Sequence, residues 1–205
     1  MPTNTIYAKK IPDWLVADSA VISAIPKNIG QWLLDDTSLT LRVKNYCTEH
    51  DLGLFSVKVL SQGICQPSSD EIKGLKLNNE QDALIREVLL YGGESPLIYA
   101  RTVIPSQTLT GEQKVLGELG NRPLGEFLFS QPDLERDDME VASLKQGQQL
   151  FDSAISHLKS NPGEIWARRS VFRLKHKPLL VAEVFLPDIL KYLPNQHSTS
   201  SSVSR

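Results

Sequence analysis

The sequence is short of several features that define common classes of protein. Its 205 residues include two cysteines and two methionines, and the 22 basic and 24 acidic side chains nearly balance. No stretch gathers Lys and Arg into a block, so we expect no nucleic-acid partner, because contact with phosphates needs concentrated positive charge. Motifs for a phosphate-binding glycine loop, a His-Glu-x-x-His zinc site and a Gly-x-Ser-x-Gly nucleophile elbow are all missing from the sequence.

Long apolar runs are missing as well. No uncharged stretch approaches the roughly 18 residues that a membrane-spanning helix requires. The first apolar stretch, 14–26, contains Asp18 and is followed by Lys27, unlike the core of a signal peptide. Cys47 and Cys65 have no His or further Cys at zinc-ligand spacing, and two thiols favour a reducing compartment, although a disulfide between them stays open. We therefore expect a cytoplasmic protein without membrane insertion.

What is present indicates a mixed fold. Helical spacing over 28–50 predicts two short helices separated at 35–38, and alternation over 55–59 predicts a strand. The runs 84–91 and 97–104 around a Gly-Gly turn predict a hairpin, as do 166–175 and 179–186. The remaining expectations are a surface loop over 66–80, helices over 111–120, from Pro123 and over 150–158, an ambiguous strand over 135–144, and a disordered tail over 195–205.

These elements favour a particular architecture. About six strands follow one another mainly through short turns, which favours an antiparallel α+β fold over a parallel one. We expect one domain over residues 28–190, preceded by an N-terminal extension over 1–27 and followed by a polar tail over 191–205.

Charged residues inside the apolar strands are the informative polar features. Alternation places Arg86 on one strand face with Val88, and Glu183 on one face with Phe185. Arg168 lies in the first strand of the second predicted hairpin, again on an apolar side. A buried charge without a partner is costly, so each of these groups must find a counter-ion or a ligand.

Two interpretations of these charges stay open. In the structural one, Glu183 pairs with Arg86, Arg101 or Arg168 and serves only the fold. In the functional one, the Arg86 guanidinium binds a substrate carboxylate as a fork, while Glu183 holds a substrate hydroxyl or transfers a proton. Arg101 and Arg168 are then candidates for supporting the site. The four histidines fall in loop, helix, turn and tail contexts and receive no catalytic role.

An ordered set of segments resembles the chorismate pyruvate-lyase family. The segments are WLL at 32–34, SLT at 38–40, REVLL at 86–90, ARTVIP at 100–105, PLG at 123–125, LF at 128–129, WARRS at 166–170, and PLL at 178–180 running to EVFLP at 183–187. The resemblance covers roughly residues 28–187. It implies a single α+β domain with a six-stranded antiparallel sheet and helices that enclose the product against that sheet.

The resemblance also implies an activity and a site. The activity is cleavage of chorismate to 4-hydroxybenzoate and pyruvate by a monomer without metal or cofactor, supplying the head group of a quinone such as ubiquinone or plastoquinone. Carried over by position, the ligand contacts are Leu39, Arg86, Leu124 and Glu183. Leu39 replaces a Met common at that place in the family. About fifteen additional residues at 147–162 depart from the family pattern, which predicts a different cover over the pocket.

One alternative comes from another class of protein. Effector-binding domains of certain transcription regulators resemble the same fold without lyase activity, and fold does not fix function. Such regulators carry a helix-turn-helix before the sensor, and residues 1–27 are short and weakly basic for that role. A member that binds an aromatic acid without turnover is the third possibility.

Overall fold

The computed structural model describes residues 10–78 and 81–191. The strands are β1 Leu15–Val16, β2 Phe55–Cys65, β3 Ala83–Gly92, β4 Ser95–Pro105, β5 Leu134–Arg136, β6 Glu140–Lys145, β7 Glu164–Leu174 and β8 Lys177–Phe185. The helices are α1 Ser19–Ala24, α2 Lys27–Leu33, α3 Leu39–Glu49, α4 Ser69–Leu75, α5 Leu124–Phe129 and α6 Gln149–Ile155, with 3-10 helices η1 Gly111–Glu118 and η2 Pro187–Leu190. The α+β class expected from the sequence is confirmed.

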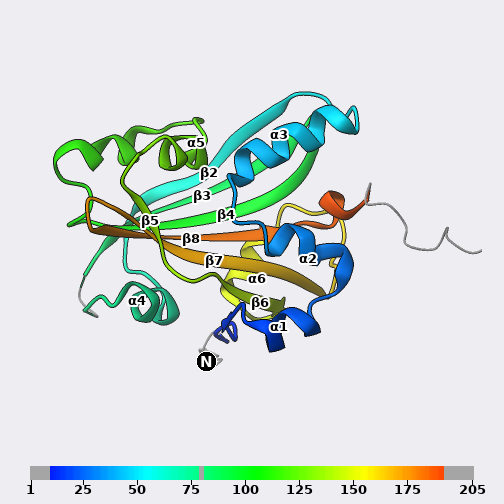
Figure 1. Ribbon diagram of the computed structural model, residues 1–205, viewed down its shortest axis with the longest axis horizontal. Coiled ribbons are helices and arrows are strands. Elements are labelled where there is room, and N and C mark those ends of the chain that lie inside the picture. Colours follow the sequence, from blue (N-terminus) through cyan, green and yellow to red (C-terminus); the bar gives the residue numbers. More distant parts are fainter. Residues whose placement is uncertain (1–9, 79–80, 192–205) are drawn as a thin grey trace, which may run out of the picture.

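All described strands join one antiparallel sheet in the order β1-β6-β7-β8-β4-β3-β2, and β5 pairs with β7 beside this path (Figure 1). The described sheet has eight strands, so the expected count of six was too low. The six long strands match the expectation, and the two additional strands are β1 and β5, of two and three residues. Strands this short carry no readable alternation. Through β1, residues before 28 also belong to the sheet.

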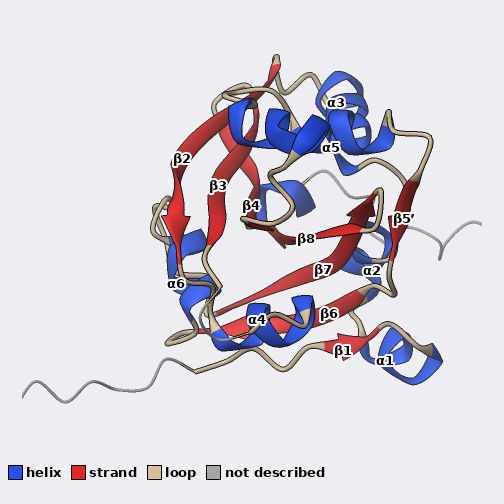
Figure 2. Cartoon of the chain, turned by 90° about the vertical axis from the view of Figure 1, so that its left-hand side faces the viewer, coloured by secondary structure: helices blue, strands red, loops and turns tan. Residues whose placement is uncertain are grey.

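The sheet is curved, and helices lie on both of its faces (Figure 2). On one face, which we call the inner face, α2, α3 and α5 pack over apolar side chains of β3, β4 and β8. On the opposite, outer face, α4 and α6 bury Leu75, Phe151 and Ala154 against the other set of strand side chains. The segment 147–162 therefore contributes to the outer face and does not cover the inner one, contrary to the expectation for that segment.

Two boundaries next to the inner face lie where the sequence predicts them, whereas β2 runs to Cys65, beyond the predicted 55–59. Ser38 caps α3, with its hydroxyl accepting from the Leu41 N–H at 3.5 Å, and residues 35–38 separate α2 from α3. The first hairpin turns at Gly93, where φ is +57° and a Cβ would lie 2.1 Å from the Leu52 carbonyl oxygen. Glycine is therefore required at this turn.

Residues 66–80 are not simply the surface loop that their composition suggests, because they contain α4. A capping box starts this helix: the Ser68 N–H donates to Glu71 Oε2 at 2.8 Å. The helix has seven residues, and its polar content comes from an exposed side and from two acidic groups that bind arginines of the sheet. A short helix that buries one leucine and otherwise contacts the sheet through ion pairs leaves little apolar periodicity in the sequence.

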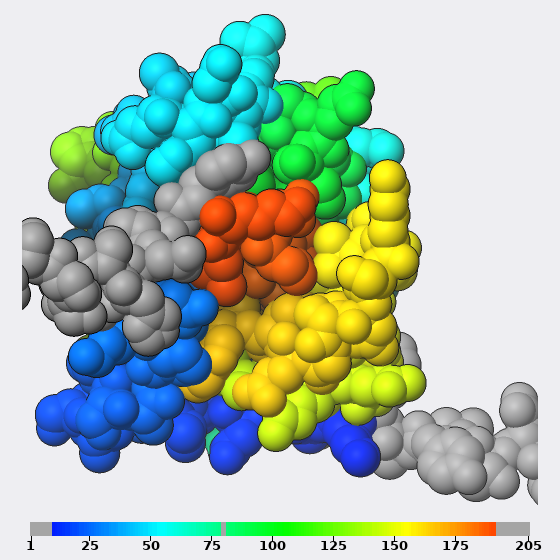
Figure 3. All heavy atoms as spheres, turned by 90° about the vertical axis from the view of Figure 1, so that its right-hand side faces the viewer, coloured from blue at the N-terminus to red at the C-terminus, as the bar shows by residue number. Residues whose placement is uncertain are grey.

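The end of the described chain closes one side of the molecule. η2, drawn in orange, lies between the cyan residues of the α3 region and the yellow residues near α6 (Figure 3). Tyr46 donates from its hydroxyl to the Ile189 carbonyl at 2.9 Å, which fixes η2 to α3. In the described ranges no helix has the length and apolarity to cross a membrane. Cys47 and Cys65 are free thiols, and the predicted tail over 195–205 lies outside the described residues.

Candidate active site

A cavity lies on the inner face of the sheet, beneath α3 and α5. We call it the inner cavity. Its apolar walls come from the strands and from the first turns of the two helices. The lining residues relevant to chemistry are Leu39, Thr40, Arg86, Thr102, Leu124, Arg136, Arg168 and Glu183. The fold thus brings to one site five residues that the sequence analysis singled out and that lie far apart in the chain: Leu39, Arg86, Leu124, Arg168 and Glu183.

Arg86 is the most unusual charge in this cavity. Its side chain is 2% exposed, and Nη2 donates to the Gly120 and Arg122 carbonyls at 2.8 and 3.3 Å. No ion pair joins it to an acid among residues 10–78 and 81–191, and Nε is buried without a hydrogen-bond partner. Burial lowers the pKa of Arg86, as expected for a cation without a neighbouring carboxylate. The structural interpretation therefore does not hold for Arg86, which pairs neither with Glu183 nor with another carboxylate among the described residues.

Glu183 pairs instead with Arg168 on the neighbouring strand. The two are register partners between β8 and β7, and Arg168 Nε donates to Glu183 Oε2 at 2.6 Å. Arg168 Nη1 also donates to the Trp32 carbonyl at 3.1 Å and to the Asp35 carbonyl, so this guanidinium closes the C-terminal end of α2. The Glu183 side chain stays 19% exposed and lines the inner cavity. One carboxylate is therefore both a structural partner and available to a ligand.

Leu39 and Leu124 are each the first residue of a helix, α3 and α5 respectively. The N–H groups in the first turn of a helix have no acceptor within that helix. In α3 they also lie at the positive end of the helix dipole, which favours anions. Both residues line the inner cavity together with Arg86, so the starts of both helices lie beside it.

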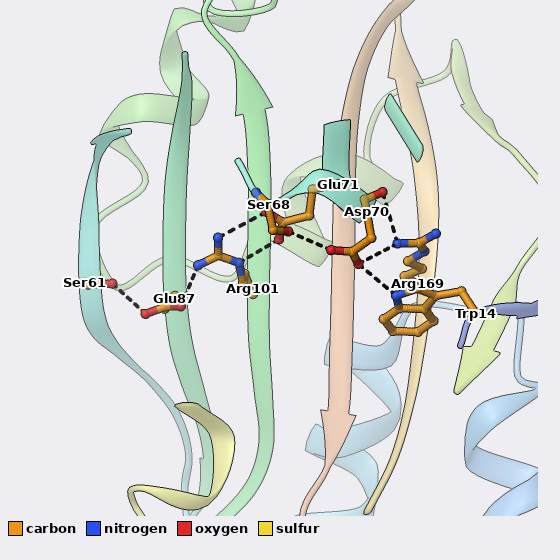
Figure 4. A network of polar contacts seen from close by, with 8 residues as sticks. All are labelled: Trp14, Ser61, Ser68, Asp70, Glu71, Glu87, Arg101 and Arg169. Carbon is orange, nitrogen blue, oxygen red and sulfur yellow. Dashed lines mark hydrogen bonds and ion pairs between the residues drawn. The ribbon is translucent and has the colours of Figure 1, made fainter. Parts of the chain in front are cut away.

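Arg101 lies apart from this group, on the outer face of the sheet. It forms two bonds with Glu71 of α4, at 2.7 and 3.1 Å, and one with Glu87 at 2.7 Å (Figure 4). These two carboxylates raise the pKa of Arg101 although burial alone would lower it. The alternation of β4 explains the placement, since Ala100 and Thr102 face the inner cavity and Arg101 points the other way.

The same outer network attaches the N-terminal part of the chain. Arg169 Nη1 bonds Asp70 of α4 at 3.1 Å, and the Trp14 indole donates to that carboxylate at 3.0 Å (Figure 4). Arg169 Nε also donates to Glu140 at 2.6 Å. All these charges are paired, so this network serves the fold and does not resemble a site that waits for a ligand.

Sequence reasoning missed Arg136, which also lines the inner cavity. It ends β5, a strand of three residues in a segment whose pattern is ambiguous. Alternation over so few residues cannot assign a face. The neighbouring residues offered no other signal.

Comparison with known proteins gives a consistent result. The model of the family described as chorismate lyase matches residues 10–193. A probable chorismate pyruvate-lyase of Nitrosospira multiformis is 37% identical over 184 residues, which are 90% of this chain and 98% of that protein. One from Methylococcus capsulatus is 40% identical over 159 residues, covering 78% and 94% of the two chains. The chorismate pyruvate-lyase of Pectobacterium carotovorum is 34% identical over 166 residues, 81% of each.

Among solved structures, the C-terminal domain of PhnF superposes with a TM-score of 0.52 at 14% identity, covering 65% of this chain and 83% of that one. A GntR-family transcriptional regulator of Bacillus cereus gives 0.50 at 12% identity, covering 73% and 99%. Identities this low show a shared fold alone. The similarity in sequence to chorismate lyases is much higher and spans nearly the whole chain. The chain therefore belongs to the chorismate lyase family.

Proposed function

We propose that the protein is a chorismate pyruvate-lyase, which converts chorismate to 4-hydroxybenzoate and pyruvate. The observation that carries the proposal is Arg86, a buried guanidinium without an acidic partner among the described residues, in a cavity that also contains an acceptor carboxylate. An arginine in this state is complementary to a carboxylate ligand, because the ligand would supply the missing negative charge.

In this proposal the ring carboxylate of chorismate binds Arg86. Arg86 Nε, buried and without a partner, supplies one donor of the fork. The N–H groups of Leu39 and Leu124 add neutral donors at the starts of α3 and α5. A backbone donor does not depend on the side chain, so the Leu at position 39 in place of the common Met leaves this contact intact.

Glu183 would accept a hydrogen bond from the C4 hydroxyl of the ring. Its bond with Arg168 holds the carboxylate in place, and its exposure to the cavity leaves oxygen lone pairs for the ligand. The same contact would persist with the phenol of 4-hydroxybenzoate. The product would therefore be held by the same two residues as the ring of the substrate, which favours slow product release.

The reaction needs only a redistribution of bonds within chorismate. The C3–O bond to the enolpyruvyl arm breaks, the C4–H electron pair forms the C3=C4 double bond of the aromatic ring, and the C4 proton passes to the arm's methylene to give the methyl group of pyruvate. Aromatisation supplies driving force. Residues that hold the arm over C4 would provide most of the rate by positioning, which can lower a barrier by several kcal/mol.

The product and the setting complete the proposal. 4-Hydroxybenzoate would supply the aromatic head group of a quinone such as ubiquinone or plastoquinone. We place the enzyme in the cytoplasm, as a monomer that works on a small molecule and does not bind nucleic acid. The absence of a basic cluster in a chain of net charge -2 supports the last point.

The test uses the purified full chain with chorismate as the only substrate. We expect pyruvate and 4-hydroxybenzoate to appear in equal amounts. Pyruvate is measured by its coupled enzymatic reduction, and 4-hydroxybenzoate is measured by chromatography. Folded protein that gives neither product overturns the lyase. If such protein still bound 4-hydroxybenzoate in a calorimeter, the chain would be a binding domain of the kind that the regulator structures represent.

A further inference from the structure

Arg136 is a second guanidinium in the inner cavity without an acidic partner. Within the described ranges its side-chain bonds all go to neutral acceptors. Nε donates to the Ser170 hydroxyl at 3.0 Å, and Nη1 donates to the Asp36 carbonyl at 3.1 Å. The guanidinium carbon also lies 5.1 Å from the centre of the Phe172 ring. These contacts orient the side chain from two sides and leave its charge without a counter-ion in contact.

Neighbouring charges and burial also affect the pKa of Arg136. Burial lowers the pKa of Arg136, and the positive charge of Arg168 lowers it further. Glu183, Asp36 and Asp35 act in the opposite direction on that pKa, but Glu183 is bonded to Arg168 and Asp35 to Arg42. A partly buried cation beside a second cation is stabilised by any anion that enters the cavity.

The strand order places Arg136 and Arg86 on different sides of Glu183. Glu183 lies on β8, near the middle of the sheet. Arg86 is on β3, two strands away on one side through β4. Arg136 is on β5, two strands away on the other side through β7. In strand order the two unpaired guanidinium groups therefore flank the acceptor carboxylate. Along the strands both are displaced from it in the same direction, by two residues for Arg86 and by four for Arg136.

Chorismate presents a matching arrangement of charge. Its ring carboxylate and its C4 hydroxyl lie at opposite ends of the ring, and the enolpyruvyl arm on C3 carries the second carboxylate next to the hydroxyl end. With the ring carboxylate at Arg86 and the hydroxyl at Glu183, the arm leaves the ring beside Glu183, at the end away from Arg86. A guanidinium on that side is what a dicarboxylate requires.

We propose that Arg136 binds the carboxylate of the enolpyruvyl arm. This inference rests on the proposed function, since it assigns the second carboxylate of the same substrate. Arg136 is then a substrate-binding residue that distinguishes chorismate from 4-hydroxybenzoate, because the product has lost the group that Arg136 holds. Its bonds with Ser170 and Asp36 set the direction from which the arm is held over the ring.

The experiment compares substrate and product in the same variants of the full chain. Arg136→Gln should raise the KM for chorismate at least about tenfold, the effect expected for loss of one charge-assisted contact. It should change the Kd for 4-hydroxybenzoate, measured by calorimetry, by less than about twofold. Arg136→Lys, which keeps the charge but loses the fork, should recover part of the loss. Arg86→Gln should weaken both ligands.

Arg173→Gln is the matched control, because Arg173 lies on β7 near Arg136 but bonds Asp137 at 2.7 Å and does not line the cavity. It should leave both constants unchanged. Equal weakening of chorismate and 4-hydroxybenzoate by Arg136→Gln, in protein with an unchanged melting temperature, overturns the assignment, as does no effect on either. Wild-type protein that fails to release pyruvate instead overturns the proposed function, and this is established before any variant is compared.

Discussion

Arg168 and Glu183 are partners across β7 and β8, with Arg168 Nε 2.6 Å from Glu183 Oε2. The same guanidinium donates to carbonyls at the end of α2, so the carboxylate is tied to the helix that covers the inner face. The pair therefore fixes where Glu183 presents its remaining lone pairs. This arrangement suits a residue that orients a hydroxyl, since its position is determined before the ligand binds.

The substitution Glu183→Gln distinguishes an orienting role of Glu183 from a role as general base. Glutamine keeps the size and one acceptor oxygen but loses the charge, so we expect affinity for 4-hydroxybenzoate to fall about tenfold. Turnover of chorismate should stay within about tenfold of the wild type, because in the proposed reaction the proton passes within the substrate. Pre-steady-state release of pyruvate measures the chemical step apart from product release.

A large loss of rate in Glu183→Gln would indicate that Glu183 is a general base. A general base contributes about a hundredfold to ten-thousandfold in rate. A loss of that size in the chemical step, with unchanged affinity for 4-hydroxybenzoate, would show that Glu183 takes the proton and would replace the orienting role.

Substitution of two buried arginines, one on each face of the sheet, should change the free energy of unfolding to very different degrees. Arg101→Met leaves Glu71 and Glu87 without their shared partner, and breaking a buried ion pair costs about 3–5 kcal/mol. Arg86→Met removes bonds to two carbonyls, about 1 kcal/mol each, and at the same time removes a desolvated charge. We therefore expect Arg86→Met to lose activity with much less change in the free energy of unfolding.

Urea denaturation of the two variants and the wild type measures this contrast. Equal destabilisation by both substitutions would mean that Arg86 serves the fold to the same degree as Arg101. In that case Arg86 would be a structural cation and not the group that binds a ligand carboxylate.

The sequence could predict the inner-face charges because long strands alternate regularly. Arg86, Arg168 and Glu183 each lie in a strand of nine or more residues, so their faces followed from their apolar neighbours. Which strands are adjacent was not contained in that pattern, and so the partner of Glu183 stayed open among three arginines. Leu39 and Leu124 were identified through family resemblance, because a backbone donor leaves no trace in side-chain chemistry.

The sequence pattern did not predict the position of Arg136 or the helix α4. Arg136 is positioned by a strand of three residues and by a pairing with β7 that only the folded chain creates. α4 is held by Asp70 and Glu71 against arginines far away in sequence, so its polar composition predicted a loop. In both places long-range ionic or sheet contacts override local periodicity.

The stability of the protein should fall in acid partly through Glu87. Burial alone would raise the pKa of this carboxyl, but the hydrogen bond and charge of Arg101 and the bond from the Ser61 hydroxyl, at 2.7 and 2.9 Å, outweigh burial and lower the pKa below the ordinary 4.5. A group whose pKa is lower in the folded state stabilises that state above its unfolded pKa and loses the contribution as pH falls through the folded pKa. The free energy of unfolding should therefore decrease below about pH 4.5.

Glu87→Gln tests this dependence by denaturation between about pH 6 and pH 3. The variant should be less stable near neutrality and should lose less stability on acidification than the wild type. Glu94→Gln, in the exposed turn between β3 and β4, is the control and should reproduce the wild-type slope. Parallel slopes for all three proteins would remove Glu87 as a source of acid sensitivity.

The contact between α3 and α5 is predicted to depend on Gly125. A Cβ at this position would lie 2.6 Å from Thr40 Oγ1, which is too close without movement, and 3.4 Å from Thr40 Cβ, which is a close but ordinary contact. Gly125→Ala should therefore cost about 1–3 kcal/mol of stability. It should also separate the helix starts that carry Leu39 and Leu124, so the KM for chorismate should rise. Gly63→Ala, where a Cβ would meet nothing within 4 Å, should change neither quantity. If Gly125→Ala matched that control in both, the two helices would be free to adjust, and close packing at Gly125 would not be what places the two backbone donors beside Arg86.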